Sequence, residues 1–388
     1  MNEPKLRFKA DDGNAFPDWE EKKLGEIATR VTRKNKDNVT DIPLTISSAY
    51  GLIDQRDFFN KVVASKDMSG YYLLNNGEFA YNKSYSKGYD FGSIKRLDLY
   101  VCGALSTLYI CFALDENENS DFYQKYFDSL SWYAELQKIC AEGARNHGLL
   151  NVPTNDFFQL KLRVPSSKDE QQKIADFLST IDTVIAKQKE TVSAWEERKK
   201  GVMQKLFSQE VRFKADDGSN FPEWEKKPFG DIVSEFKVKT KVENEDTLLS
   251  CAINGVFLNS ELFGHQRGQS NIGYLKIKKG TLILSAQNLH LGNANVNLRF
   301  EHGIISPAYK TYDIVGCSDE YMSQWVKWDI TKQFFYNATT VGASECRRNV
   351  DWNMLYSQLF AVPCLAEQQK IADCLSSFDE VIEKQKAT

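Results

Sequence analysis

The stretch RFKADDGNAFPDWEEKKLGEI spans residues 7–27, and RFKADDGSNFPEWEKKPFGDI spans residues 212–232. Both begin with RFKADDG and keep Phe, Pro and Trp at the same relative positions, at an offset of 205. A match of this length between distant parts of one chain indicates an internal repeat. The chain is therefore predicted to consist of two copies of one long unit.

The repeat continues downstream with an offset that shrinks steadily. LSTLY at residues 105–109 corresponds to ISPAY at residues 305–309, an offset of 200, and EQQKIAD at residues 170–176 returns at residues 367–373, an offset of 197. Small insertions and deletions between related copies produce such a drift, whereas chance matches would scatter. The copies are most alike at their edges and differ in their middles. The similar edges are called here the constant frame, and the divergent middles the variable middles.

The composition predicts folded domains of nearly balanced charge. A chain of 388 residues is long for one core, because domains usually contain ~100–200 residues. The 42% hydrophobic and 12% aromatic residues favour packed domains over disorder. The net charge of −4 argues against a protein that coats nucleic acid by bulk charge. Any site for a polyanion must be a local patch.

The cysteines and the start of the chain indicate a cellular compartment. Eight cysteines are scattered without a CxxC pair, so we expect no metal site. The opening MNEPKLRF lacks the apolar segment of a signal peptide, and no run approaches the ~18 apolar residues of a membrane span. We therefore expect a soluble cytoplasmic protein with reduced thiols and no membrane contact.

The two variable middles carry the same mixture of strand and helix signals. In residues 28–164, short strand-like runs such as IPLTI, GEFAYN and STLYICFAL alternate with Gly and Asn. One helix is predicted from Ser120, which can cap it, to about Cys140. Residues 233–362 repeat this plan, with a helix near residues 319–337. Both middles are predicted to be mixed α and β domains.

A long helix is predicted after each variable middle. Ser167 and Glu170 have the spacing of a capping box, and a rod of ~60 Å would run from Lys168 to Ser208. Steps of four and three residues give this helix a coiled-coil seam. Its members are Ile174, Leu178, Ile181, Ile185, Gln188, Val192, Trp195, Lys199, Val202 and Leu206. The second helix carries Ile371, Leu375, Phe378, Ile382 and Gln385 on the same seam.

The two helices are expected to pack on each other. Because Thr388 aligns with Thr191, the first helix has further seam residues without counterparts in the second. We expect four of these to face nothing within the chain, so that a truncated helix or a partner explains them: Val192, Trp195, Val202 and Leu206. The alternative is that the coiled coil is only a spacer.

These patterns predict an α+β fold with pseudo-twofold symmetry. Two tandem homologous mixed α/β domains would be separated by long antiparallel coiled-coil helices. The predicted boundaries are residues 1–165 for the first domain, 166–209 for the central helix, 210–363 for the second domain and 364–388 for a shortened C-terminal helix.

The constant frame resembles that of DNA-specificity subunits of type I restriction-modification systems. The resemblance rests on the FPxWExKxLGEI-like motif that begins at Phe16 and again at Phe221. It rests also on the run from Pro165 to Asp182, with EQQKIADFLSTID, and on its repeat from Pro363 to Asp379. It covers the whole chain in the order of that family: variable domain, long helix, variable domain, helix.

The resemblance implies a function in DNA recognition. Each variable domain would be a target-recognition domain that reads one half of a bipartite site in double-stranded DNA, and the divergent middles imply an asymmetric site. The helices would set the half-site spacing and dock two methyltransferase subunits, and restriction subunits would join them. Adenine methylation and cleavage would be carried out by these partners, so this subunit itself would not be an enzyme.

In the first domain, two segments are candidates for DNA contact. Residues 81–96 interleave cations, which can neutralise phosphates, with tyrosines, which can pack on sugars or bases. The candidates here are Lys83, Tyr85, Lys87, Lys95 and Arg96. GARNHG adds Arg145, Asn146 and His147, because Arg and Asn can make bidentate contacts to guanine and adenine. The alternatives are a tyrosine-rich strand pair with solvated lysines and an ordinary polar loop.

The second domain offers three corresponding sets of candidates. A lysine cluster precedes Gly280, SAQNLHLGN supplies amides and a histidine on a predicted loop, and two arginines align near the GARNHG loop. The residues are Lys276, Lys278, Lys279, Gln287, Asn288, His290, Arg347 and Arg348.

No pattern of intrinsic catalysis is present in the sequence. The chain lacks an NPPY-like adenine-methyltransferase motif, a glycine-rich cofactor loop and a GxxxxGK[ST] phosphate loop, and its four histidines lack metal-like pairing. We expect no cofactor. A duplicated adaptor that binds protein through its domains and assembles by its coiled coil is the alternative function. A lone DNA-binding regulator, which would bind tightly without a methyltransferase, is the third.

Overall fold

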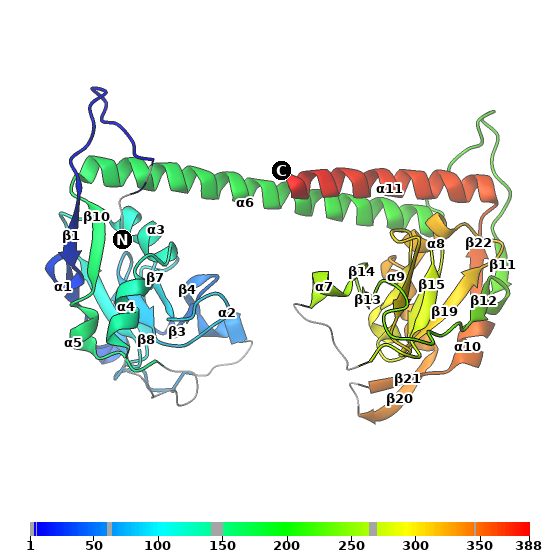
Figure 1. Ribbon diagram of the computed structural model, residues 1–388, viewed down its shortest axis with the longest axis horizontal. Helices are drawn as coiled ribbons and strands as arrows, with labels where there is room; N and C mark the ends of the chain where they lie inside the picture. Colours follow the sequence, from blue (N-terminus) through cyan, green and yellow to red (C-terminus); the bar gives the residue numbers. More distant parts are fainter. Residues whose placement is uncertain (1–3, 5, 60–63, 141–149, 264–269, 345–346) are drawn as a thin grey trace. The chain divides into compact units, whose positions relative to one another are not determined.

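The computed structural model describes residues 4, 6–59, 64–140, 150–263, 270–344 and 347–388 (Figure 1). It divides into two compact units, Met1–Ile185 and Ala186–Thr388, called here the first and the second unit. Each unit combines strands with helices, so the mixed α/β class expected from the sequence is confirmed.

The first unit is built on a four-stranded antiparallel sheet in the order β2-β9-β6-β7. These strands are β2 (Ala28–Arg30), β6 (Phe79–Asn82), β7 (Ser93–Arg96) and β9 (Ile110–Leu114). Three two-stranded sheets pair β1 (Trp19–Lys23) with β10 (Lys161–Pro165), β3 (Leu44–Ser47) with β4 (Gly51–Asp54), and β5 (Tyr72–Asn75) with β8 (Cys102–Leu105). The helical elements are α1 (Leu24–Ile27), η1 (Lys36–Asn38), α2 (Gln55–Phe59), α3 (Ser120–Asp128), α4 (Tyr133–Ile139), α5 (Thr154–Phe157) and the start of α6 (Lys168–Phe207).

Both faces of this sheet are buried because its strands are apolar at successive positions. On one face, Phe79 stacks on its cross-strand partner Phe112 at 5.4 Å between ring centroids, and the aromatic face of α3 covers them. On the other face, Ala80 and Cys111 pack with Leu44 and its neighbours. Period-two alternation thus divides β6 and β9 between two hydrophobic clusters.

The single helix predicted from Ser120 to Cys140 is wrong. The chain forms α3 and α4 instead, and Leu130 between them takes a left-handed conformation with φ of 60°. The turn places Trp132 in the core, where its indole donates a hydrogen bond to the Phe127 carbonyl at 2.9 Å. Asn119 caps α3 by accepting from the Phe122 amide, so Ser120 is not the cap.

The second unit has a four-stranded antiparallel sheet in the order β12-β19-β16-β17. These strands are β12 (Val233–Phe236), β16 (Leu282–Ser285), β17 (Ala294–Val296) and β19 (Tyr309–Ile314). Pairs are formed by β11 (Glu225–Pro228) with β22 (Leu359–Val362), β13 (Leu249–Ala252) with β14 (Gly255–Leu258), β15 (Leu275–Lys278) with β18 (His302–Ile305), and β20 (Thr339–Ser344) with β21 (Arg347–Val350). The helical elements are η2 (Phe229–Asp231), α7 (Asn259–Leu262), η3 (Leu289–Leu291), α8 (Asp319–Trp325), α9 (Asp329–Asn337), α10 (Trp352–Ser357), α11 (Leu365–Ala387) and the remainder of α6.

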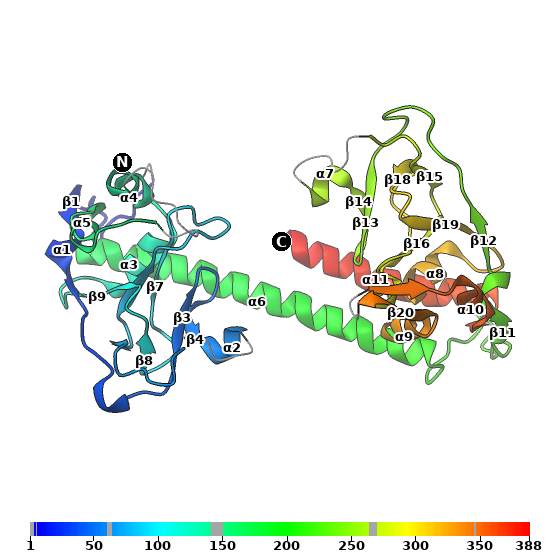
Figure 2. The ribbon, with the colours of Figure 1, turned by 90° about the horizontal axis from the view of Figure 1, so that it is seen from below.

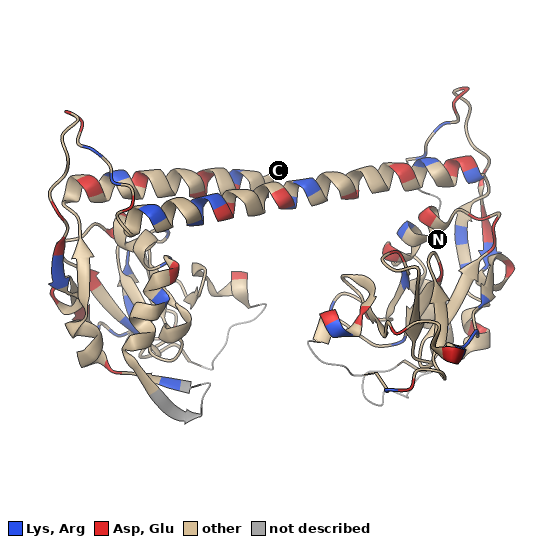
Figure 3. Ribbon diagram, turned by 180° about the vertical axis from the view of Figure 1, so that it is seen from behind, with Lys and Arg blue, Asp and Glu red and all other residues tan. Residues whose placement is uncertain are grey.

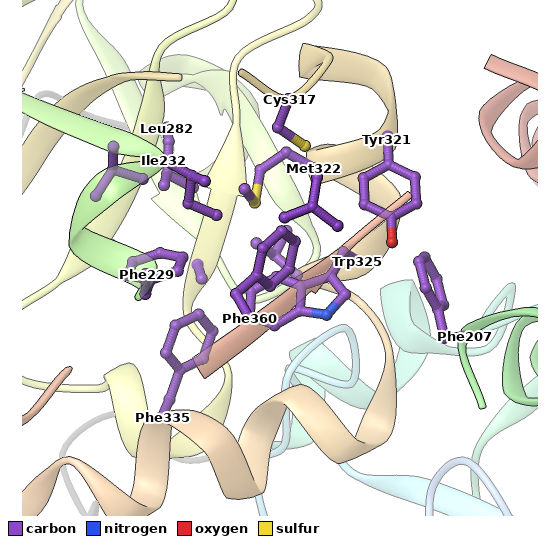
Figure 4. Packing of buried hydrophobic residues seen from close by; sticks show 14 of the residues in the cluster. Phe207, Phe229, Ile232, Leu282, Cys317, Tyr321, Met322, Trp325, Phe335 and Phe360 are labelled. Atoms are coloured by element: carbon purple, nitrogen blue, oxygen red, sulfur yellow. The ribbon is translucent and has the colours of Figure 1, made fainter. Parts of the chain in front are cut away.

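The core of the second unit is aromatic and includes the end of α6. Trp325 of α8 meets Phe360 of β22 edge-to-face at 4.5 Å between ring centroids, and Phe229 packs beside them (Figure 4). Phe207, the last residue of α6, lies against Tyr321 at 5.5 Å. The helix predicted near residues 319–337 is also divided in the structure, into α8 and α9.

Within the second unit, α11 runs antiparallel to α6 (Figures 1 and 2). Gln188 donates to the side chain of Gln385 at 2.9 Å, and farther along α6 the ring of Trp195 meets that of Phe378 at 6.1 Å. Lys199 pairs with Asp379 at 2.6 Å.

The expectation that the last seam residues of α6 face nothing is wrong. Trp195 contacts Phe378, Leu206 is buried, and Val202 packs against the core of the second unit. Val192 is half-buried. These residues are covered because the end of α6 belongs to the second unit, where the chain folds back on it.

The structure shows what the repeated stretch at residues 7–27 and 212–232 does in each unit. Arg7 donates to the Glu170 carboxylate from Nε at 2.9 Å and from Nη2 at 2.7 Å, and the carboxylate also accepts from Trp19. Glu170 is fully buried. Its hydrogen bonds connect the start of α6 to Arg7 and to Trp19, the first residue of β1. The Glu170 side chain, which the sequence assigns to a capping box with Ser167, is engaged by Arg7 and Trp19.

The second unit repeats this cluster with the equivalent residues. Arg212 donates to the buried Glu367 carboxylate from Nε at 3.0 Å and from Nη2 at 2.8 Å. The Trp224 indole donates to the same carboxylate at 3.0 Å. The constant frame is thus an Arg–Glu–Trp cluster that fastens the start of each unit to the long helix at its end. Charge-assisted, bidentate hydrogen bonds are the strong type for such a fastening.

Candidate nucleic-acid interface

The first candidate segment follows β6 and leads into β7. Lys83 is half-buried and donates from Nζ to the Val152 carbonyl at 2.9 Å. Burial lowers the pKa of Lys83, and the charge of Arg30 lowers it further. Tyr85 is 61% exposed and Lys87 is also exposed, so these two side chains are accessible to a ligand.

Lys95 and Arg96 lie on β7 and are engaged in ion pairs. Lys95 pairs with Asp128 at 2.6 Å. Arg96 pairs with Asp98 at 2.6 Å and with Asp121 at 2.7 Å. Both side chains therefore hold α3 and the β7 end together, and a phosphate would have to compete with carboxylates for them. The candidates Arg145, Asn146 and His147 lie outside the described residues.

The lysine cluster of the second unit is paired in the same way. Lys276 pairs with Glu245, Lys278 with Asp313 at 2.9 Å, and Lys279 with Glu301 at 3.1 Å. These contacts are largely exposed, and exposed pairs are worth only ~0–1 kcal/mol, so an anionic ligand could displace the carboxylates. Figure 3 shows Lys and Arg interspersed with Asp and Glu along the ribbon rather than separated by sign.

The remaining candidates of the second unit differ in accessibility. Gln287 and Asn288 are exposed in the turn before η3, and His290 is half-buried in η3. Arg348 donates to the Thr339 hydroxyl at 2.7 Å and lies 4.0 Å from the centroid of the Tyr336 ring. Arg347 belongs to β21, but its side chain lies outside the described residues.

A second group of cations, which the sequence patterns did not single out, follows the first strand of the four-stranded sheet in each unit. Lys34 and Lys36 follow β2, and Lys237, Lys239 and Lys241 follow β12. All except the half-buried Lys34 are exposed. A comparison of the two copies through their variable middles would have shown the shared Lys-x-Lys spacing at an offset of 205.

Three thiols of the described residues are deeply buried. Burial raises the pKa of Cys111, Cys251 and Cys317 to about 12, which suppresses the reactive thiolates. No group of three His, Cys, Asp or Glu residues in the described ranges is arranged to hold a metal ion. A search of the same ranges finds no helix with the length and apolarity needed to cross a membrane.

Lys327 is half-buried and lines a cleft of about 780 Å³ in the second unit. Burial lowers the pKa of Lys327 to about 8. Its ammonium donates to the Ile253 carbonyl at 2.6 Å, the Ala294 carbonyl at 2.9 Å and Asn295 Oδ1 at 2.6 Å. These three acceptors use the donor capacity of an ammonium group. Lys327 therefore ties the β13–β14 turn to β17, a structural role.

Comparison with known proteins identifies what the chain resembles. Residues 17–193 match the pattern of the type I restriction modification DNA specificity domain. The type I restriction enzyme MjaVIII specificity subunit of Methanocaldococcus jannaschii is 23% identical over 97% of this chain and 90% of its own length.

Two solved structures share the fold. One comes from work on complex assembly and conformational transition of the type I R-M system, with a TM-score of 0.53 and 14% identity, covering 96% of this chain and 92% of that one. The other is the type I restriction-modification S subunit of M. genitalium, with a TM-score of 0.50 and 13% identity, covering 99% of this chain and 94% of that one.

Proposed function

We propose that the chain is a DNA specificity subunit of a type I restriction-modification system and that its two units are tandem target-recognition domains. Each unit reads one half of a bipartite, asymmetric site in double-stranded DNA. Partner subunits carry out adenine methylation and restriction at that site. The observation that carries the proposal is the constant frame repeated around two variable domains.

The architecture of the two units supports a tandem arrangement with pseudo-twofold symmetry. Both sheets follow the same order of equivalent strands, β2-β9-β6-β7 and β12-β19-β16-β17. Both units fasten their first strand to a long helix through the same Arg–Glu–Trp cluster. Two related readers with different middles would recognise different half-sites, because base contacts specify sequence. The proposed domains are residues 1–165 and 210–363, each followed by a helix.

An exposed apolar face on α6 supports docking of a methyltransferase subunit. In the first unit, Leu178, Ile181 and Ile185 of the seam are 37%, 42% and 46% exposed, and Phe177 and Val184 beside them are also exposed. In the second unit Leu375 and Ile382, the equivalents of Leu178 and Ile185, are buried, and Phe378, the equivalent of Ile181, is half-buried. Clustered apolar side chains on a surface mark interaction sites. We propose that two methyltransferase subunits assemble on the helices and that restriction subunits join them.

A competition gel shift tests the proposal. The probe is a duplex carrying the motif that is methylated in cells with the intact system, and the sample is the chain assembled with its methyltransferase subunits. We expect a random-sequence competitor to displace the probe only at a concentration roughly 10³-fold or more above that of unlabelled probe, as for specific DNA binders. Equal competition by both duplexes would reject sequence recognition and favour a protein-binding adaptor.

A further inference from the structure

We propose that Lys34 and Lys36 in the first unit, and Lys239 and Lys241 in the second, contact DNA phosphates and fix the position of each unit on its half-site. This inference rests on the proposed function. The lysines would bind the DNA backbone whatever the base sequence of the half-site. Each pair is called here a lysine clamp.

The two clamps occupy the same place in the two units. In the first unit, the Leu73 amide donates to the Arg33 carbonyl at 2.8 Å, and the Asn35 amide donates to the Tyr71 carbonyl at 3.0 Å. Lys34 is thereby paired with Tyr72 in an antiparallel bridge.

The second unit forms the corresponding bonds. The Lys276 amide donates to the Val238 carbonyl at 2.8 Å, and the Thr240 amide donates to the Tyr274 carbonyl at 2.8 Å. Lys239 is paired with Leu275 in an antiparallel bridge. Identical backbone pairing makes Lys34 equivalent to Lys239 and Lys36 equivalent to Lys241.

The residue between the two lysines anchors each clamp. Asn35 is buried, donates to the Thr40 carbonyl at 3.0 Å and accepts from the Thr40 amide at 3.1 Å. Thr240 is also buried, donates its hydroxyl to the Asn271 carbonyl at 2.7 Å and accepts from the Tyr274 amide. Fixed middle residues reduce the backbone entropy that the flanking lysines would lose on binding an anion.

Three of the four clamp lysines are available for an anion, whereas the lysine cluster before Gly280 is ion-paired. In the described part of the chain, Lys36, Lys239 and Lys241 are exposed and form no ion pair, whereas the adjacent Lys276 pairs with Glu245. Lys34 donates to the Gly70 carbonyl at 2.9 Å and lies 4.1 Å from the centroid of the Tyr72 ring.

Further cations extend each clamp on its own unit. Arg30 donates to the Tyr72 hydroxyl at 3.5 Å and is close enough to lower the pKa of Lys83, a candidate DNA contact. In the second unit, Lys237 is exposed two residues before Lys239. Positive charge therefore continues from the clamp of the first unit towards the segment after β6.

The retention of Lys-x-Lys in both variable middles indicates what the clamps bind. Two domains that read different half-sites need different base contacts, so their middles diverge. The phosphate backbone is the part of DNA that is the same at every half-site, and contacts to it set register without carrying sequence information. Basic residues kept at equivalent positions in otherwise different readers are suited to that constant part.

Salt-dependent binding by the assembled complex tests this inference. The variants are Lys34→Gln with Lys36→Gln, and Lys239→Gln with Lys241→Gln, each measured on the methylated-motif duplex and on a duplex with one half-site scrambled. Each phosphate contact contributes ~0.9 to the slope of log K against log salt, so each double variant should lower the slope by about 1.8. The affinities for both duplexes should fall by the same factor, roughly tenfold or more at 100 mM salt.

The control is Lys9→Gln with Lys214→Gln, which removes two exposed lysines at equivalent positions of the constant frame. Its salt slope should equal that of the wild type, and all variants should melt at the wild-type temperature. The proposed phosphate contacts would be wrong if the clamp variants kept the wild-type salt slope. They would also be wrong if affinity fell only for the duplex with the intact motif. Wild-type preference for the intact motif over the scrambled duplex tests the proposed function separately.

Discussion

Replacement of Glu367 by Gln is expected to destabilise the second unit by about 3 kcal/mol. The buried carboxylate accepts two bonds from Arg212 and one from Trp224, and removing one partner of a buried ion pair costs ~3–5 kcal/mol. We expect the low end of this range because the Arg212 side chain is 21% exposed and can be partly rehydrated. Hydrogen exchange of the β11–β22 amides should report a roughly 100-fold loss of protection.

Glu223→Gln is the matched control for this variant. Glu223 contacts the same guanidinium at 3.3 Å, but its side chain is 92% exposed. Its loss should change stability by no more than ~0.5 kcal/mol, because exposed substitutions away from special features have small effects. If both variants had equally small effects, the Arg–Glu–Trp cluster would not be what fastens the frame.

Introduction of charge on the exposed seam of α6 is expected to prevent assembly with the methyltransferase subunits. The variant is Ile181→Glu combined with Ile185→Glu. Burial of one such side chain contributes ~1.5–3 kcal/mol, so the loss of two should weaken association at least ~100-fold. Analytical ultracentrifugation of the chain mixed with the methyltransferase subunits measures this directly. Because both residues are exposed, the variant itself should fold and melt normally.

Thr183→Glu with Ala186→Glu supplies the control on the same helix. Both residues are exposed, and the 3.6-residue period places them on the opposite side of α6 from Ile181 and Ile185. This variant adds the same charge and should assemble like the wild type. Normal assembly of the seam variant would contradict docking on this face.

Local sequence patterns predicted the secondary structure well only where local forces decide it. Runs such as GEFAYN and STLYICFAL contain β6 and β9, because short continuous apolar runs bounded by Gly, Asn or other turn residues favour buried strands. The break at Leu130 escaped detection, since no Gly or Pro marks it and burial of Trp132 imposes it. Glu170 fitted a capping box by spacing, but Arg7, 163 residues away in sequence, engages it in the folded chain.

Local sequence also could not predict which candidate DNA-binding residues are engaged by other side chains. Lys95 and Arg96 have the composition of a phosphate site, yet their acidic partners on and near α3 come from up to 33 residues away in sequence. Such pairs depend on tertiary structure and leave no local pattern. The lysine clamps were detectable in principle, because Lys34 and Lys36 recur as Lys239 and Lys241 at a fixed offset. Sequence identity in the surrounding variable segment is too low to draw attention to them.

The central claim is that each unit reads its own half-site and that catalysis is supplied by partners. Its most direct test is methylome sequencing of cells that carry the complete system, before and after residues 233–362 are replaced by the corresponding segment of another specificity subunit. The proposal predicts methylated adenine within a split, asymmetric motif, and after the exchange one half of the motif changes while the other half is retained. A motif that changes in both halves, or in neither, would contradict it.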